Sequence, residues 1–212
     1  MKLLTPLFIT GTGTDVGKTL ISAIITEALQ ADYWKPVQAG YSGGTDSLWV
    51  EKMLTNTKSV VHPELYRLKM PASPHLAAPA ENIKISIKQI VASVPQTKNQ
   101  LIIEGAGGLM VPLNENEFIL DLIKKVEARV VIVSKNELGS INHSLLTAAV
   151  LKKEKIDVTG WIFTDEYKNY DTEIAKWSGY PIIANVKHLQ SISKEIIEAE
   201  AFKMRPLLKA IL

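Results

Sequence analysis

The chain of 212 residues contains no cysteine, which excludes disulfides, thiolate metal sites and cysteine nucleophiles. Neither sign of charge dominates, because 24 basic and 22 acidic residues leave a net charge of +2. A polyanion such as nucleic acid is therefore a poor ligand, whereas a small anion fits better. Apolar runs also stay below the roughly twenty residues of a membrane-spanning helix. These absences predict a cytoplasmic protein without nucleic-acid or membrane partners.

The apolar start of the chain, residues 1–4, is soon interrupted by Pro6 and Gly11, which argues against a secretory signal peptide. No internal repeat or low-complexity segment divides the chain. With 46% hydrophobic residues and no recognisable linker, the sequence predicts a single nucleotide-binding domain over residues 1–212 once the motifs below are included.

Short apolar runs rich in β-branched residues alternate with helical patterns. The predicted strands are residues 7–9, 33–37, 101–103, 130–133, 158–163 and 182–184. The predicted helices are residues 18–30, 45–54, 118–126, 140–153 and 171–177, with a last one from about Ser193 to the C-terminus. Such alternation is typical of an α/β protein with a mainly parallel twisted sheet and helices on both faces. The proline-rich segment 55–95 is predicted to cross the binding edge, with one helix near residues 86–93.

A glycine-rich stretch, Gly-Thr-Gly-Thr-Asp-Val-Gly-Lys-Thr at residues 11–19, follows the first predicted strand. Strand, glycine turn and helix in this order aim backbone N–H groups and the positive end of the helix dipole at one anion. Lys18 then reaches the terminal phosphates of a nucleotide, and the Thr19 hydroxyl holds Mg²⁺. Five residues separate Gly11 from Gly17, one more than usual. We favour a fold of the P-loop NTPase type over an ordinary glycine-containing turn.

Polar residues follow other predicted strands, whose carboxyl ends meet at the same edge of the sheet. Lys35 lies inside an apolar strand, where burial is costly without an anion, so we favour an anion ligand over a snorkelling lysine. Asp46 stands near a helix start, and taken alone its favoured role is to cap that helix. Glu104 ends an apolar strand, where nucleotide-binding sheets place a carboxylate for Mg²⁺. The helix start at Ser140 is a second potential anion pocket.

These motifs together resemble the dethiobiotin synthetase family over most of the chain, in the same order. They are residues 11–19, Lys35-Pro36-Val37 with Gly40, Asp46, Ala72-Ser73-Pro74-His75, Glu104-Gly105-Ala106-Gly107-Gly108, Leu138-Gly139-Ser140-Ile141-Asn142-His143 with Leu146-Thr147, and Gly160-Trp161. The five-residue gap between Gly11 and Gly17 is a mark of this family. The resemblance implies a cyclo-ligase of the biotin pathway that uses ATP and Mg²⁺. Such an enzyme joins CO₂ to 7,8-diaminononanoate and closes the ureido ring of dethiobiotin.

The resemblance also implies roles for single residues. Catalysis falls to Lys18, on the transferred phosphoryl group, and to Lys35, on the substrate carbamate. Nucleotide contacts fall to Asp15, Val16, Gly17, Lys18, Thr19, Leu20, Asp46, Glu104, Gly105, Ala106, Gly107, Thr164 and Asp165. Substrate contacts fall to Thr14, Lys35, Val37, Ala39, Gly40, Gly139, Ser140, Ile141 and Asn142, and Mg²⁺ contacts to Thr19, Asp46 and Glu104. The family forms homodimers with a shared active site, in which the partner subunit's turn 138–142 receives the substrate carboxylate.

Two other functions share the loop and the sheet. A dimeric ATPase of regulatory or positioning type usually carries an extra lysine near the start of the loop, and Gly11, Thr12 and Gly13 supply none. An amidotransferase-like synthetase domain predicts a longer chain and a cysteine nucleophile. The synthetase is therefore favoured, with the regulatory ATPase as the alternative.

Three departures from the family pattern concern the substrate and the base. Ala39 stands where the family often has Ser or Thr, so a hydroxyl contact to the substrate is missing. Thr164-Asp165 replaces an Asn-Asp pair that reads adenine, and residues 185–189 replace a proline-containing base loop. The last two changes predict a relaxed nucleotide preference.

We predict that CTP and GTP support turnover within about tenfold of the ATP rate, because a site without base-reading hydrogen bonds discriminates weakly. Initial rates measured side by side with the three nucleotides test this expectation. Strict dependence on ATP would contradict it.

Overall fold

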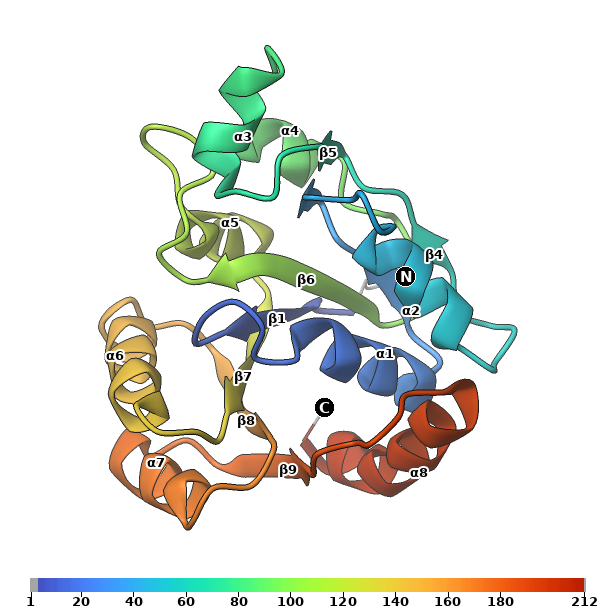
Figure 1. Cartoon of the computed structure of the whole chain (residues 1–212), viewed down its shortest axis with the longest axis vertical. Helices are drawn as coiled ribbons and strands as arrows, with labels where there is room; N and C mark the ends of the chain where they lie inside the picture. Colours follow the sequence, from blue (N-terminus) through green and yellow to red (C-terminus); the bar gives the residue numbers. More distant parts are fainter. Residues whose placement is uncertain (1–3, 212) are drawn as a thin grey trace.

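The structure, a computed structural model, describes residues 4–211; residues 1–3 of the apolar start and Leu212 at the end of the last predicted helix lie outside the described residues. Within that range, a parallel sheet of seven strands has the order β4-β2-β6-β1-β7-β8-β9 (Figure 1). Its strands are β1 (Leu7–Gly11), β2 (Asp32–Trp34), β4 (Val61–His62), β6 (Leu101–Gly108), β7 (Arg129–Lys135), β8 (Val158–Thr164) and β9 (Ile182–Val186). The predicted α/β class with a parallel sheet is confirmed.

Helices cover both faces of this sheet (Figure 1). Those in the described range are α1 (Lys18–Leu29), α2 (Asp46–Met53), α3 (Pro74–Ala80), α4 (Ile87–Ala92), α5 (Ile119–Val126), α6 (Ser140–Lys153), α7 (Tyr170–Ser178) and α8 (Lys194–Ile211). Outside the proline-rich segment, the observed helices begin and end within one residue of the predicted ones. None of the helices within residues 4–211 has both the length and the apolar character needed to span a membrane.

Strand residues alternate between two apolar layers. Leu7 and Ile9 of β1 pack in the layer that contains α1 and α8, whereas Phe8 packs in the layer on the other face. All three side chains are fully buried. Because β1 lies in the middle of the sheet with helices on both sides, its sequence is a continuous apolar run without polar alternation.

The predicted strand 33–37 is wrong as a single element. The main-sheet strand β2 ends at Trp34, and β3 (Val37–Ala39) belongs to a separate two-stranded sheet with β5 (Tyr66–Leu68). Pro36 has no backbone N–H to donate to a strand ladder, so the pairing stops before it. The break lets Lys35 leave the sheet beside Glu104 of the neighbouring strand β6.

The proline-rich segment 55–95 holds more structure than the one predicted helix. It contains β4, β5 and the seven-residue helix α3 in addition to α4, which matches the predicted helix. Pro74 occupies the first turn of α3, where its missing N–H costs nothing. The carboxyl ends of the parallel strands meet at one edge, next to this segment.

Candidate active site

The loop between β1 and α1 is shaped to receive an anion. Gly17 precedes α1 with a φ of 89°, and none of the described side chains caps the helix, so N–H groups of its first turn stay available. A Cβ atom on residue 17 would lie 2.9 Å from Cγ2 of Thr164. The Thr164 hydroxyl donates to the Val16 carbonyl at 3.0 Å. The end of β8 therefore supports the loop directly.

Lys18 begins α1 and reaches back across the loop, where its Nζ donates to the Gly13 carbonyl at 2.7 Å. Only 8% of Lys18 is exposed. Burial lowers its pKa to about 8, and Lys35 adds repulsion, although the Glu104 carboxylate opposes both effects. A phosphate group beside this amine would supply counter-charge and favour the ammonium form.

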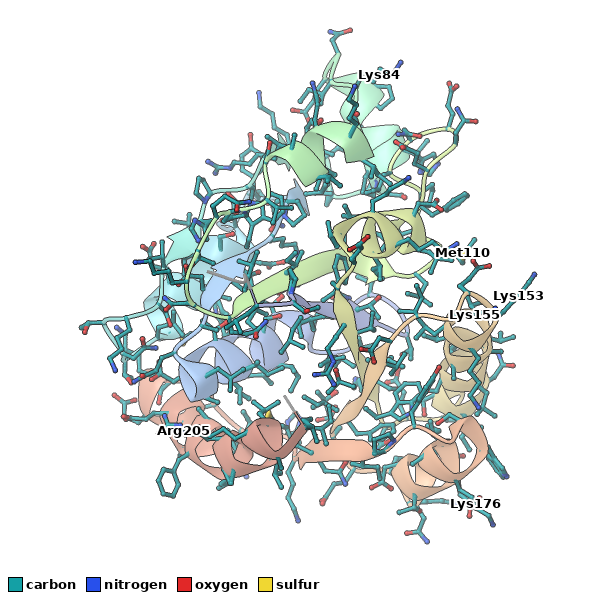
Figure 2. All side chains as sticks on the ribbon, turned by 180° about the vertical axis from the view of Figure 1, so that it is seen from behind. Lys84, Met110, Lys153, Lys155, Lys176 and Arg205 are labelled. Carbon is teal, nitrogen blue, oxygen red and sulfur yellow. The ribbon has the colours of Figure 1, made fainter. Side chains whose placement is uncertain are left out.

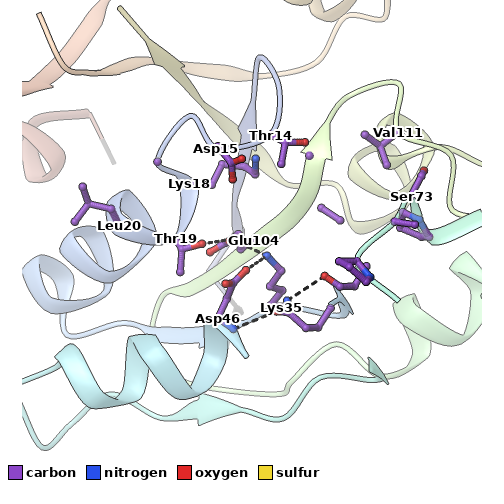
Figure 3. A pocket seen from close by; sticks show the side chains of 18 residues that line it. Thr14, Asp15, Lys18, Thr19, Leu20, Lys35, Asp46, Ser73, Glu104 and Val111 are labelled. Carbon is purple, nitrogen blue, oxygen red and sulfur yellow. Dashed lines mark hydrogen bonds and ion pairs between the residues drawn. The ribbon is translucent and has the colours of Figure 1, made fainter. Parts of the chain in front are cut away.

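Lys35 follows β2 and is 6% exposed. Its ammonium donates to Oδ2 of Asp46 and to Oε1 of Glu104, the latter at 2.8 Å (Figure 3). Burial alone would lower the pKa of Lys35, but the two carboxylates raise it above its ordinary value. The side chain therefore stays charged and faces anions, and it does not snorkel to solvent.

Asp46 is the first residue of α2, but it is not the cap. Thr45 caps this helix, because its side-chain oxygen accepts from the Leu48 N–H at 3.2 Å. The capping role predicted for Asp46 is therefore wrong. Gln38 accepts from the Asp46 N–H at 3.1 Å and donates to the Gly40 carbonyl at 2.9 Å, which fixes the start of α2 beside the cavity.

Glu104 lies at the centre of the polar network and is 1% exposed. Its Oε1 accepts from the Thr19 hydroxyl at 3.0 Å as well as from Lys35, and its Oε2 accepts from the Tyr33 hydroxyl at 2.9 Å. Burial would raise the pKa of Glu104, but the Lys35 charge and the hydrogen bonds from Lys35 and Tyr33 lower it below its ordinary value. The carboxylate is therefore ionised at neutral pH.

The donor set fits Mg²⁺, which prefers hard oxygen ligands. Thr19, Asp46 and Glu104 contribute only oxygen atoms, and the Lys35 ammonium shows that a cation can lie between the two carboxylates. Within residues 4–211, no three His, Asp or Glu side chains gather as a metal site. Proteins commonly hold Mg²⁺ with one or two carboxylates and the phosphates of a substrate, and this donor set matches that mode.

These residues line a cavity of about 700 Å³ at the carboxyl edge of the sheet (Figure 3). Its lining brings together twelve of the predicted site residues: Thr14, Asp15, Gly17, Lys18, Thr19, Leu20, Lys35, Ala39, Asp46, Glu104, Ala106 and Gly107. The volume is in the range of about 300–1,000 Å³ that is usual for small-molecule sites.

The other predicted site residues do not line this cavity: Val16, Val37, Gly40, Gly105, Gly139, Ser140, Ile141, Asn142, Thr164 and Asp165. At Gly105 a Cβ would lie 2.7 Å from the Phe8 ring, so the glycine makes room for a core side chain. The Thr164 hydroxyl is engaged by the loop, and Oδ1 of Asp165 lies 3.1 Å from Nδ1 of His188.

Sequence reasoning missed several residues of the site. Val111 and the residues 71–74 line the cavity, and Tyr33 lies beneath it. Gln38 also lines it, within the range 37–40 that the family resemblance assigns to the substrate channel. The signal for residues 72–74 was present, since they belong to a motif that carried the family resemblance. Tyr33 gave no such signal, because an aromatic residue in an apolar strand is typical of the hydrophobic core.

A family model described as an AAA domain matches residues 5–196. The ATP-dependent dethiobiotin synthetase BioD of Cytophaga hutchinsonii is 48% identical over 200 residues, which cover 93% of this chain and 95% of that protein. The protein of the same name from Christiangramia forsetii is 46% identical over 199 residues, with the same two coverages. The chain belongs to the dethiobiotin synthetase family.

Solved structures relate this member of the dethiobiotin synthetase family to P-loop ATPases. The MinC:MinD cell division protein complex of Aquifex aeolicus aligns with a TM-score of 0.65 at 12% identity, covering 98% of this chain and 96% of that chain. MinD of Pyrococcus horikoshii with Mg-ADP aligns with a TM-score of 0.59 at 14% identity, covering 96% and 90%. Identities this low show the fold alone. They confirm the P-loop NTPase type, while family membership disfavours the regulatory ATPase alternative.

We predict that the free enzyme gains stability between pH 8 and pH 9.5 through Lys18. The pKa of this amine is about 8 in the folded protein, against about 10.4 in an unfolded chain. The unfolded chain therefore holds a proton that the folded protein progressively releases, so the free energy of unfolding rises with pH, by about 1.5 kcal/mol across this window. Urea unfolding at several pH values measures the rise.

The matched control is Lys88→Met, which removes an exposed lysine of α4. The rise should persist in that variant and disappear in Lys18→Met. An undiminished rise in Lys18→Met would show that another group causes it.

Proposed function

We propose that this dethiobiotin synthetase performs its reaction in one cavity, where Lys18 and Lys35 hold two anions side by side. The observation that carries the proposal is that both buried ammonium groups line the same cavity, beside the phosphate-binding loop, with Lys35 paired to Glu104. The Lys35 charge also contributes to the lowered pKa of Lys18. The two cations therefore act as one electrostatic unit that suits two adjacent anions.

The chemistry requires such a pair. One amine of 7,8-diaminononanoate joins CO₂ and loses a proton, which gives an anionic carbamate. A carbamate oxygen attacks the γ-phosphorus of ATP, the bond to the β,γ-bridging oxygen breaks, and ADP leaves. The second amine attacks the carbonyl carbon of the mixed anhydride and loses a proton as phosphate departs. No bond to the enzyme forms, which suits a chain without cysteine.

Each residue has a role that follows from its position. Lys35 binds and orients the carbamate, and Lys18 follows the phosphoryl oxygens during transfer. Thr19, Asp46 and Glu104 hold Mg²⁺, which supplies further positive charge at the phosphates when bound. In this proposal, the carbamate would replace Asp46 and Glu104 as the anionic partner of the Lys35 ammonium, which would leave the two carboxylates to hold the metal.

Apolar residues provide the wall for the hydrocarbon part of the substrate. Ala39, Val111 and the prolines at 71 and 74 line the cavity beside the lysines. Contact with a methylene chain needs no directional partner, so apolar side chains suffice there. The small Ala39 leaves space but offers no hydroxyl.

We extend the proposal to a homodimer with a shared active site. The turn that begins α6 does not line the cavity of its own chain, and Gly139 precedes the helix with a φ of 94°. Leu138 is 79% exposed and Leu146 of α6 is 59% exposed. Met110 is 56% exposed, and Figure 2 shows it at the periphery on the side where α6 lies. Exposed apolar side chains around this turn support an interface that brings it to the partner's cavity.

The proposal treats residues 1–212 as one domain and places the enzyme in the cytoplasm. One parallel sheet links the segments that supply the site, from the β1 loop to the start of α6. ATP and bicarbonate are both available in the cytoplasm, which supports that location.

The first test is incubation with 7,8-diaminononanoate, bicarbonate, Mg²⁺ and ATP, with detection of dethiobiotin by mass spectrometry. We predict that the product forms and that Lys35→Ala reduces turnover by at least about a thousandfold, as expected for loss of a charge partner of the reacting anion. Affinity for Mg-ATP should change less than tenfold, since Lys18 and the loop remain. Absence of dethiobiotin with the unaltered enzyme would refute the function.

Lys88→Ala is the matched control for loss of one lysine and should retain full turnover. Unchanged turnover in Lys35→Ala would remove Lys35 from the mechanism while leaving the overall function standing. Thermal unfolding of the variant in the presence of Mg-ATP confirms that the folded protein is being assayed.

The shared site gives a separate prediction about mixed dimers. Lys35→Ala and Asn142→Asp should each be inactive alone, the second because a carboxylate in the turn repels the substrate carboxylate. After subunit exchange, half of the dimers are mixed and one of their two sites is intact, so about a quarter of the normal activity returns. Rates measured before and after exchange test this, and no recovery after proven exchange would place both residues in one subunit's site.

A further inference from the structure

Tyr33 occupies a position that the proposed function leaves without a role. It lies in β2 opposite Ile102 of β6, and its side chain belongs to the apolar layer on the α1 side of the sheet. Glu104 follows two residues after Ile102, so it projects to the same face as Tyr33. The tyrosine is fully buried, which makes a hydroxyl there costly unless it is hydrogen-bonded.

The two oxygens of Glu104 have different partners. Oε1 accepts from the Thr19 hydroxyl at 3.0 Å and from the Lys35 ammonium at 2.8 Å, and it faces the cavity residues. Oε2 accepts from the Tyr33 hydroxyl at 2.9 Å, and no other described side chain donates to it. Tyr33 therefore holds the half of the carboxylate that points away from the phosphate-binding loop.

We propose that Tyr33 is a positioning residue that fixes the Glu104 carboxylate so that Oε1 is presented to Mg²⁺. The inference rests on the proposed role of Glu104 as a metal ligand. A terminal carboxylate torsion is broad and roughly two-fold, so a single ligand oxygen needs an external contact to set its direction. Lys35 and Thr19 hydrogen-bond to Oε1 only while they are not bound to substrate or metal. The hydrogen bond from Tyr33 is made to Oε2 alone, so ligand binding at Oε1 does not replace it.

The hydroxyl is the part of Tyr33 that carries this role. Its ring packs among apolar side chains from α1 and the neighbouring strands, which a phenylalanine ring would also do. The buried environment and the Glu104 charge raise the pKa of Tyr33 well above its ordinary value, so the phenol stays protonated and donates. Tyr33→Phe therefore deletes the hydrogen bond while it keeps the packing.

The experiment measures Mn²⁺ and Mg²⁺ affinity directly, by calorimetry on the full-length enzyme saturated with ADP. In Tyr33→Phe we expect metal affinity to fall about 10- to 100-fold, the usual cost of losing a contact that orients a ligand. Affinity for ADP in the presence of EDTA should stay within about twofold, since the hydroxyl touches no nucleotide group. In turnover, the Mg²⁺ concentration for half-maximal rate should rise by the same factor, with kcat recovering at high Mg²⁺.

Tyr66→Phe is the matched control, because Tyr66 is another buried tyrosine whose hydroxyl is hydrogen-bonded, to Gln89, outside this network. It should leave metal affinity unchanged. Glu104→Gln tests the metal role of Glu104 separately from the positioning role of Tyr33. It removes the charge of the ligand itself and should weaken metal binding more than Tyr33→Phe does.

Unchanged metal affinity in Tyr33→Phe, with Glu104→Gln impaired, would overturn the positioning role and leave the metal role of Glu104 intact. Unchanged affinity in both variants would refute the metal role, and with it the basis of the inference. A loss of thermal stability in Tyr33→Phe with normal metal affinity would also overturn it, because the hydroxyl would then serve only the fold.

Discussion

The buried carboxylate of Glu104 is the group on which the site depends. It is 1% exposed and ionised, and it links Thr19 of α1 to Tyr33 and Lys35, which lie in and just after β2. An ion of this kind is tolerated inside a protein only when paired and hydrogen-bonded, and removing one partner of a buried pair costs about 3–5 kcal/mol. The positions of α1, β2 and β6 are therefore tied to the electrostatics of one side chain.

This arrangement links stability to chemistry. Without ligands, Lys35 compensates the carboxylates of Asp46 and Glu104, and the pKa of Lys35 is raised as a result. Lys18 lacks a comparable partner close by and has a lowered pKa. One lysine is thus kept charged by the protein's own anions, and in the proposed mechanism the other gains its counter-charge from phosphate. Under that proposal, a site for two anions is stable before either anion arrives.

Individual contacts between residues that are close in space support the site. Thr164 at the end of β8 packs against Gly17, and its hydroxyl donates to the Val16 carbonyl. Strand β8 therefore holds the phosphate-binding loop in place. Gln38 ties Asp46 to the turn after β3. Gly105 makes room for the Phe8 ring, which lets β6 run close to β1 just before the cavity. Each of these contacts involves a residue whose role depends on its neighbours in space.

Patterns along the chain predicted the parallel α/β class, six of the helices to within one residue, the phosphate-binding loop, and Lys18, Lys35, Asp46 and Glu104 as candidate site residues. Periodic apolar runs and a contiguous glycine motif are local signals, and local signals can be read along a chain. Three features became visible only in the folded chain: residues 33–37 are broken at Pro36, Thr45 and not Asp46 caps α2, and Tyr33 contacts Glu104. These outcomes depend on which side chains meet across strands that are distant in sequence, and the burial that makes a partner obligatory exists only after the chain has folded.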